Sequence, residues 1–170
     1  MSLRMAALGL LAQHPGSGYD LLRRFEKSMA NVWPATQSQL YGELNKLAGA
    51  GLIEASAVGP RGRKEYRVTE AGRAELLRWI TNPADDPPER SAGLLRIFLL
   101  DELPRDQARA HLLSLAHHSE SEVERLKQLE ASIDWDADED TYGHAALEYG
   151  LRFNAMQAQW ARDVAARLDK

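Results

Sequence analysis

The chain has 170 residues, of which 44% are hydrophobic and 27% are charged, and this composition is typical of a globular protein with a buried core. It contains no cysteine, which excludes a disulfide framework, thiolate metal sites and cysteine nucleophiles. No apolar run reaches the roughly 18 residues of a membrane span, and Met5–Ala12 is too short for a convincing signal peptide. A soluble cytoplasmic protein is therefore expected.

Charge is divided unequally along the chain. Residues 1–80 contain 11 Lys/Arg and 7 Asp/Glu, whereas residues 81–170 contain 10 and 18, within a net charge of −4. A basic half joined to an acidic half indicates that only the first half faces a polyanion.

Three helices are predicted before residue 50. The first is Leu3–Gln13, and the second opens at a capping-box spacing of Ser17 and Asp20. The expected buried face of the second helix consists of Tyr19, Leu22, Phe25 and Met29. Another capping-box spacing, Thr36 and Gln39, opens the third helix, whose apolar stripe is Leu40, Leu44 and Leu47.

A β-hairpin and a fourth helix follow. Residues 52–57 and 63–68 are expected to be short strands joined by the basic turn 58–62, and Thr69 is expected to cap a helix that contains Leu76, Leu77 and Ile80. Helices followed by a hairpin wing in this order predict a winged helix-turn-helix.

The second half is predicted to be helical. Pro83, Pro87 and Pro88 mark a linker, so we expect a winged-helix domain at residues 1–80, a linker at 81–92 and a helical dimerisation and candidate effector domain at 93–170. Residues 94–100 are apolar at six of seven positions and are expected to be buried on nearly every side. Two long helices should follow, at about 104–133 with Leu112, Leu115, Leu126, Leu129 and Ile133 on one stripe, and at about 141–168 with Tyr142, Ala146, Tyr149, Phe153, Met156 and Trp160 on another.

The third helix carries the polar side chains that predict DNA reading. With the leucine stripe turned inward, Ser38, Tyr41, Gly42 and Asn45 project outward, with Gln39 and Lys46 on the other flank. Hydroxyl and amide groups can pair with base edges in the major groove, and Gln37 and Ser38 stand at the end that enters the groove first. Alternatively, Gln39 serves only as the cap partner of Thr36, Tyr41 packs on the wing, and Asn45 is merely solvated.

The predicted wing adds cations. Arg61, Arg63 and Lys64 lie at a glycine-rich tip that no core requirement explains, and such groups neutralise phosphates and release counterions. The predicted DNA contacts are therefore Gln37, Ser38, Gln39, Tyr41, Asn45, Lys46, Arg61, Arg63 and Lys64.

These segments resemble a known family. The matching stretches are residues 8–11, 18–21, 33–34, 38–44, 51–53 and 63–72, and together they are similar to PadR-family transcriptional regulators. Residues 94–99 and 149–153 with Trp160 resemble the C-terminal domain of the branch in which that domain is longer. The resemblance implies a dimeric repressor that binds a palindromic operator and is released by a small, often aromatic effector. It carries over DNA contacts at Ser38, Gln39, Tyr41, Arg63 and Lys64.

Dimerisation also follows from the apolar surface of the second half, which exceeds what two helices can hide. The expected dimer residues are Leu94, Leu95, Ile97, Phe98, Leu99, Phe153 and Trp160. A self-contained three-helix bundle is the alternative. An effector pocket could be lined by Trp135, Tyr149, Phe153, Met156 and Trp160, although such a stripe can equally be core or dimer seam.

No enzyme, cofactor or metal site is predicted. A phosphate-binding glycine loop, a GxSxG elbow and an HExxH motif are absent from the sequence. His117 and His118 point about 100° apart on a helix, and the i, i+4 pairs His118/Glu122 and His144/Glu148 have no evident third ligand. The second hypothesis for the whole chain is a winged-helix module that binds a protein and no DNA, which the acidic net charge favours.

Overall fold

The computed structural model describes residues 2–56, 64–82, 88, 90–135 and 141–168, and it divides into two compact units, residues 1–88 and 89–170. The domain limits expected from the sequence, 1–80, 81–92 and 93–170, remain a prediction.

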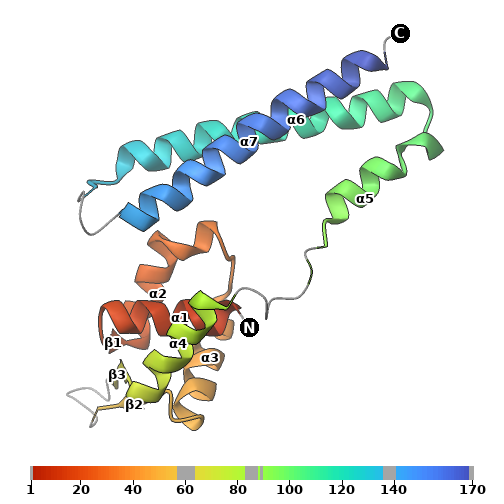
Figure 1. The fold of residues 1–170 in the computed structure, drawn as a ribbon. Helices are drawn as coiled ribbons and strands as arrows, with labels where there is room; N and C mark the ends of the chain where they lie inside the picture. Colours follow the sequence, from red (N-terminus) through yellow and green to blue (C-terminus); the bar gives the residue numbers. More distant parts are fainter. Residues whose placement is uncertain (1, 57–63, 83–87, 89, 136–140, 169–170) are drawn as a thin grey trace. The chain divides into compact units, whose positions relative to one another are not determined.

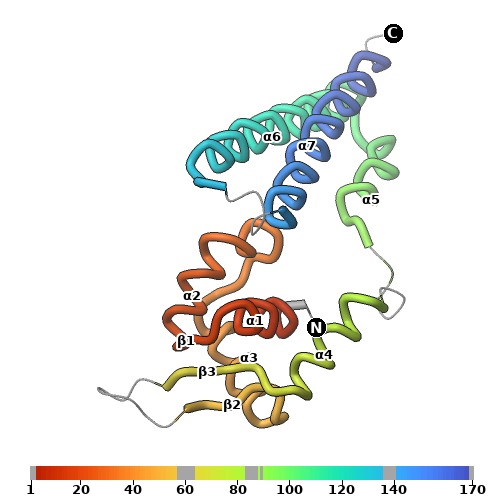
Figure 2. The backbone as a smooth tube through the Cα atoms, turned by 60° about the vertical axis from the view of Figure 1, so that its left-hand side comes forward, coloured from red at the N-terminus to blue at the C-terminus, as the bar shows by residue number. Residues whose placement is uncertain are grey.

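The first unit is a winged helix (Figures 1 and 2). Its elements in chain order are α1 (Ser2–Gln13), β1 (Gly16–Ser17), α2 (Gly18–Lys27), the short 3-10 helix η1 (Met29–Asn31), α3 (Gln37–Gly49), β2 (Ile53–Ala55), β3 (Glu65–Val68) and α4 (Glu70–Thr81). The predicted mainly helical class with a small hairpin is confirmed.

Both predicted capping boxes are present. Ser17 accepts a hydrogen bond from the backbone N–H of Asp20, and the Asp20 carboxylate accepts one from the backbone of Ser17 at 2.9 Å. Thr36 and Gln39 make the same reciprocal pair at the start of α3. Each box satisfies backbone donors that the first turn of a helix cannot pair internally, so the helix starts are fixed by local sequence.

The sheet has one strand more than the sequence predicted. β1 pairs antiparallel with β3, which also pairs with β2, so the strand order is β1-β3-β2. In the register, Gly16 faces Tyr66 and Ser17 faces Glu65. A two-residue strand has too few side chains for an alternating pattern, which is why the sequence did not predict it.

The core of the first unit lies between α1, α2 and α3. The predicted leucine stripe of α3 is buried to within 1% exposure, and α1 contributes Met5, Ala7, Leu8, Leu10 and Leu11. The predicted face of α2 is partly wrong, because Leu21 and Phe25 are the buried large residues while Tyr19 is 58% exposed. The buried face of α2 instead runs through Gly18, Leu21 and Phe25, and Gly18 is the first residue of the helix.

The segment between α3 and α4 is held in place by a glycine turn and by hydrogen bonds from a threonine side chain to backbone groups. Gly51 has a φ of 69°, which glycine adopts without the steric cost of a Cβ. The hydroxyl of Thr69 donates to the Gly51 carbonyl at 2.8 Å and accepts from the N–H of Gly72 at 3.1 Å. The predicted cap at Thr69 is therefore confirmed.

The second unit is a long antiparallel helix pair with a short helical arm. Its elements are α5 (Ala92–Phe98), the 3-10 helix η4 (Leu100–Glu102), α6 (Arg105–Ser132) and α7 (Thr141–Arg167), and α6 and α7 lie side by side along their length (Figures 1 and 2). The seam is lined mostly by small side chains, with Ala116, Ala158, Ala161 and Ala165 at 5% exposure or less. A partly buried hydrogen bond from the Ser119 hydroxyl to Gln157 Oε1, 2.9 Å long, crosses it.

Two expectations for the second unit are wrong within one subunit, and the alternative of a self-contained bundle is also not met. Residues 94–100 are not enclosed, since Leu94, Leu95, Phe98 and Leu99 are 54–84% exposed. The α7 stripe does not face α6, since Tyr142, Tyr149 and Met156 are 56–89% exposed. α5 packs chiefly against η4, so the three helices form no self-contained bundle. Helical periodicity correctly identified these helix faces as apolar. It does not specify whether the segment that packs on such a face belongs to the same chain.

Candidate nucleic-acid interface

The outward face of α3 carries polar side chains and glycines. Ser38 and Asn45 are exposed, as the leucine stripe required. Between and beyond them lie Gly42 and Gly49, where an added Cβ would meet no atom within 4 Å. The hydroxyl of Ser38 and the amide of Asn45 therefore stand beside two positions without a side chain, where a groove edge could approach the helix closely.

Two further predicted contacts on α3 have partners inside the protein. Gln39 Oε1 accepts from the backbone N–H of Thr36 at 2.8 Å and from its hydroxyl at 3.2 Å, as the capping alternative expected. Lys46 pairs with Glu43 at 2.7 Å, but its side chain is 71% exposed. Gln37 is exposed at the first turn. Lys46 remains able to exchange Glu43 for a phosphate, because its own side chain is exposed to solvent and an ion pair at the surface contributes little.

Tyr41 lies on a flank of α3 and is half-buried. Its ring lies against Gly18, the first residue of α2, where an added Cβ would be 2.6 Å from Tyr41 Cε1. The expected outward projection is therefore only partial, and the alternative of packing on the wing is replaced by packing on the start of α2.

The base of the wing is described, and its tip is not. β2 and β3 pair with Glu54 opposite Arg67, and these two side chains form a 2.7 Å ion pair on the exposed face. Lys64 is exposed just before β3. The predicted contacts Arg61 and Arg63 lie outside the described residues.

Two cationic side chains on α2 are candidate DNA contacts that the sequence did not predict. Arg23 and Lys27 are exposed and one turn apart, and no described residue forms an ion pair with either of them. Their i, i+4 spacing on the polar face of an amphipathic helix was the available signal. A helix that crosses the DNA backbone in this fold uses such side chains.

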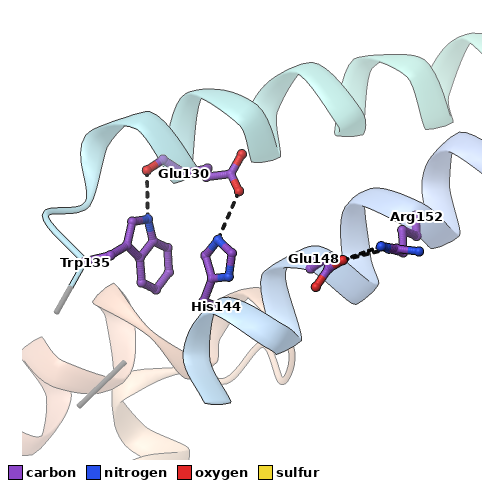
Figure 3. A network of polar contacts seen from close by, with 5 residues as sticks. All are labelled: Glu130, Trp135, His144, Glu148 and Arg152. Carbon is purple, nitrogen blue, oxygen red and sulfur yellow. Dashed lines mark hydrogen bonds and ion pairs between the residues drawn. The ribbon is translucent and has the colours of Figure 1, made fainter. Parts of the chain in front are cut away.

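The candidate effector residues of the second unit do not form one cluster within a subunit. Tyr149 and Phe153 stack with ring centroids 6.2 Å apart and an interplanar angle of 14°. Trp135 instead lies at the end of the helix pair, where its indole N–H donates to the Glu130 carbonyl at 3.1 Å and its ring meets His144 edge-on (Figure 3). A shallow groove between α6 and α7 is lined by other residues, including Val123, Ala155 and Ala158.

The histidines of the second unit lie beside a carboxylate or are exposed. His144 Nε2 lies 3.4 Å from Glu130 Oε1, while Glu148 pairs with Arg152 (Figure 3). His117 and His118 are exposed. Within the described ranges, no group of three or more His, Asp or Glu side chains could hold a metal ion. In the same ranges, no helix combines the length and apolarity needed to cross a membrane.

Two family models match the chain. Residues 7–78 match the transcriptional regulator PadR-like family, and residues 89–169 match the virulence activator alpha C-terminal domain. Together they span nearly the whole chain. The chain belongs to the PadR-like family of transcriptional regulators.

Relatives of this PadR-like regulator include proteins from three bacteria. A Mycobacterium tuberculosis protein named "Probable transcriptional regulator Rv1176c" is 40% identical over 98 residues, which are 55% of this chain and only 52% of that protein. The negative transcriptional regulator PadR of Bacillus subtilis is 26% identical over 99% of this chain and 98% of its own. The virulence activator AphA of Vibrio cholerae has a solved structure with a TM-score of 0.81, 26% identity and 98% coverage of both chains.

The B. subtilis relative has been solved in two complexes. Its structure with p-coumaric acid matches this PadR-like chain with a TM-score of 0.83, 25% identity and full coverage of both chains. Its structure with operator DNA has a TM-score of 0.81, 24% identity and 99% coverage of both chains. The winged helix of the first unit is thus the module of a known class of transcriptional regulators.

Proposed function

We propose that this protein is a homodimeric repressor that binds a palindromic operator through α3 and the wing of each subunit. The observation that carries the proposal is the bare polar face of α3, with Ser38 and Asn45 beside Gly42 and Gly49, next to a basic hairpin. Each subunit reads one half-site, and two-fold symmetry of the protein matches two-fold symmetry of the operator. The B. subtilis relative in complex with operator DNA supports this assignment.

The side chains divide into two roles. Lys46, Arg61, Arg63 and Lys64 neutralise phosphates, which supplies affinity on any sequence. Gln37, Ser38, Gln39 and Asn45 offer amide or hydroxyl groups to base edges, which supplies discrimination. Arg23 and Lys27 of α2 join the phosphate contacts.

The helical unit supplies the dimer and the response to a ligand. Leu94, Leu95, Ile97, Phe98, Leu99, Phe153 and Trp160 form the proposed dimer contacts, since most of them are exposed within one subunit. A small aromatic compound binding on the α7 face that carries Tyr149, Phe153, Met156 and Trp160 releases the DNA, and Trp135, at the end of the helix pair, is not part of this site. The complex of B. subtilis PadR with p-coumaric acid makes that acid the first compound to test. In this proposed role the protein is cytoplasmic and has no catalytic activity.

A gel-shift titration against the DNA upstream of the protein's own gene tests the proposal. Specific binding should weaken steeply with salt, and Lys64→Ala should weaken binding to all sequences and reduce the salt slope by about one. Lys127→Ala, an exposed lysine of the second unit, is the matched control and should leave the slope unchanged.

A second titration separates base reading from phosphate binding. Asn45→Ala should change the ranking of operator variants, whereas Lys64→Ala should leave that ranking intact. Equal loss on every sequence for Asn45→Ala would contradict base reading. Absence of DNA binding at low salt, together with salt-insensitive capture of a protein, would favour the interaction module instead.

A further inference from the structure

Gly18 lies where three elements of the first unit meet. The two residues before it form β1, which pairs with Glu65 and Tyr66 of β3, the strand that leads out of the wing. Gly18 itself begins α2 and is buried. The side chain against it is Tyr41, which comes from the middle of α3.

The contact between Gly18 and Tyr41 leaves no space for a side chain. A Cβ on Gly18 would lie 2.6 Å from Tyr41 Cε1, 3.1 Å from Cζ and 3.3 Å from the hydroxyl oxygen. The first of these distances is shorter than real Cβ contacts, so glycine at position 18 is what permits the tyrosine ring to lie at this point.

The backbone around Gly18 is held firmly on the other side. The Ser17 hydroxyl donates to Asp20 Oδ2 at 2.7 Å, and the Ser17 N–H donates to the same oxygen at 2.9 Å. β1 adds the ladder to β3. The start of α2 is therefore tied to the wing strand, and the ring of Tyr41 ties the same point to α3.

We propose that Tyr41 is a positioning residue, whose ring against Gly18 fixes α3 relative to the wing so that both meet DNA as one surface. Tyr41 projects about 100° from Leu40 on the helix, on a flank of the outward face that carries Ser38 and Asn45. The hydroxyl of Tyr41 is then not a base contact, which revises the role expected from the sequence. This inference rests on the proposed DNA-binding function.

A double-mutant cycle tests it, with Gly18→Ala, Tyr41→Ala, the double variant and Tyr41→Phe. Gly18→Ala displaces the ring and should lower operator affinity by roughly threefold to a hundredfold, the range typical of residues in direct contact, with a smaller loss on unrelated DNA. In the Tyr41→Ala background the same glycine substitution should cost nothing further. Tyr41→Phe keeps the ring and should bind the operator variants with wild-type ranking and affinity.

The matched control is Gly9→Ala in α1, where an added Cβ meets nothing within 4 Å. It should leave operator affinity unchanged. Thermal unfolding of every variant, followed by circular dichroism, shows whether Gly18→Ala is folded, and the Tyr41 variants decide the question if it is not.

Three outcomes are decisive against the inference. If Gly18→Ala costs equal affinity with and without the Tyr41 ring, the contact is not the cause. If Tyr41→Phe loses operator discrimination, the hydroxyl reads DNA directly. If folded Gly18→Ala binds like wild type, the ring does not position α3, while the DNA-binding proposal survives. Failure of the wild-type protein itself to bind its operator would remove both.

Discussion

The two units use their apolar side chains differently. In the first unit, Leu8, Leu21, Phe25 and Leu44 from three helices converge on one core at 1% exposure or less. In the second unit the shared seam is lined mostly by alanines, while large side chains such as Phe98 and Tyr149 are 84% and 71% exposed. The first unit thus has the core of an independent domain, whereas the second has apolar surface that a second copy would cover.

The largest expected effect breaks the first unit at Gly72. A Cβ there would lie 2.0 Å from the carbonyl oxygen of Leu52, which is backbone and cannot rotate away. Gly72→Ala should therefore lower the free energy of unfolding by more than about 3 kcal/mol, as strain in a packed site does. Chemical denaturation followed by circular dichroism measures this loss. A free energy of unfolding equal to that of Gly9→Ala would contradict the prediction.

The next effect tests the second unit as a dimer. Phe98→Asp places a charge on the most exposed large side chain of α5, and it should weaken self-association by about 2 kcal/mol or more if Phe98 is a central contact. Sedimentation equilibrium measures the dissociation constant. Ala166→Asp, at an exposed alanine of α7, is the control. A wild-type protein that is monomeric at micromolar concentration would refute the dimer.

A smaller effect concerns the seam of the helix pair. Ser119 is fully buried, and its hydroxyl donates to Gln157. Ser119→Ala leaves that amide oxygen without its donor and should cost about 1–3 kcal/mol, whereas Ser119→Ala with Gln157→Leu should regain much of the loss. Urea unfolding of the three proteins measures both steps. Equal stability of Ser119→Ala and wild type would mean that solvent satisfies Gln157.

The smallest effect is a pH dependence in α4. The hydrogen bond from Arg78 and its positive charge hold the pKa of Glu75 below its ordinary value, with a further contribution from Arg4. A lowered pKa adds stability at neutral pH that is lost as the pH falls through the folded value of that pKa. Glu75→Gln should therefore cost less than about 0.5 kcal/mol at pH 7, and the difference should shrink in acid. A difference that grows in acid would have the wrong sign.

The sequence predicted the helix starts and the exposed polar side of α3 better than it predicted strands and surfaces. Ser17, Thr36 and Thr69 cap helices as expected, because a cap and its partner lie within one turn of each other. β1 and the Tyr41–Gly18 contact were not predicted, because both join residues that are far apart in sequence.

The sequence alone determined the order of the main helices and of the two wing strands, the buried leucine stripe of α3 and the family to which the chain belongs, since these depend on local spacing and motifs. Only the tertiary structure decided that Tyr41 lies against the start of α2 and that the aromatic face of α7 turns away from α6. The physical reason is that periodicity reports how apolar a helix face is, whereas the element that covers the face depends on packing between distant segments.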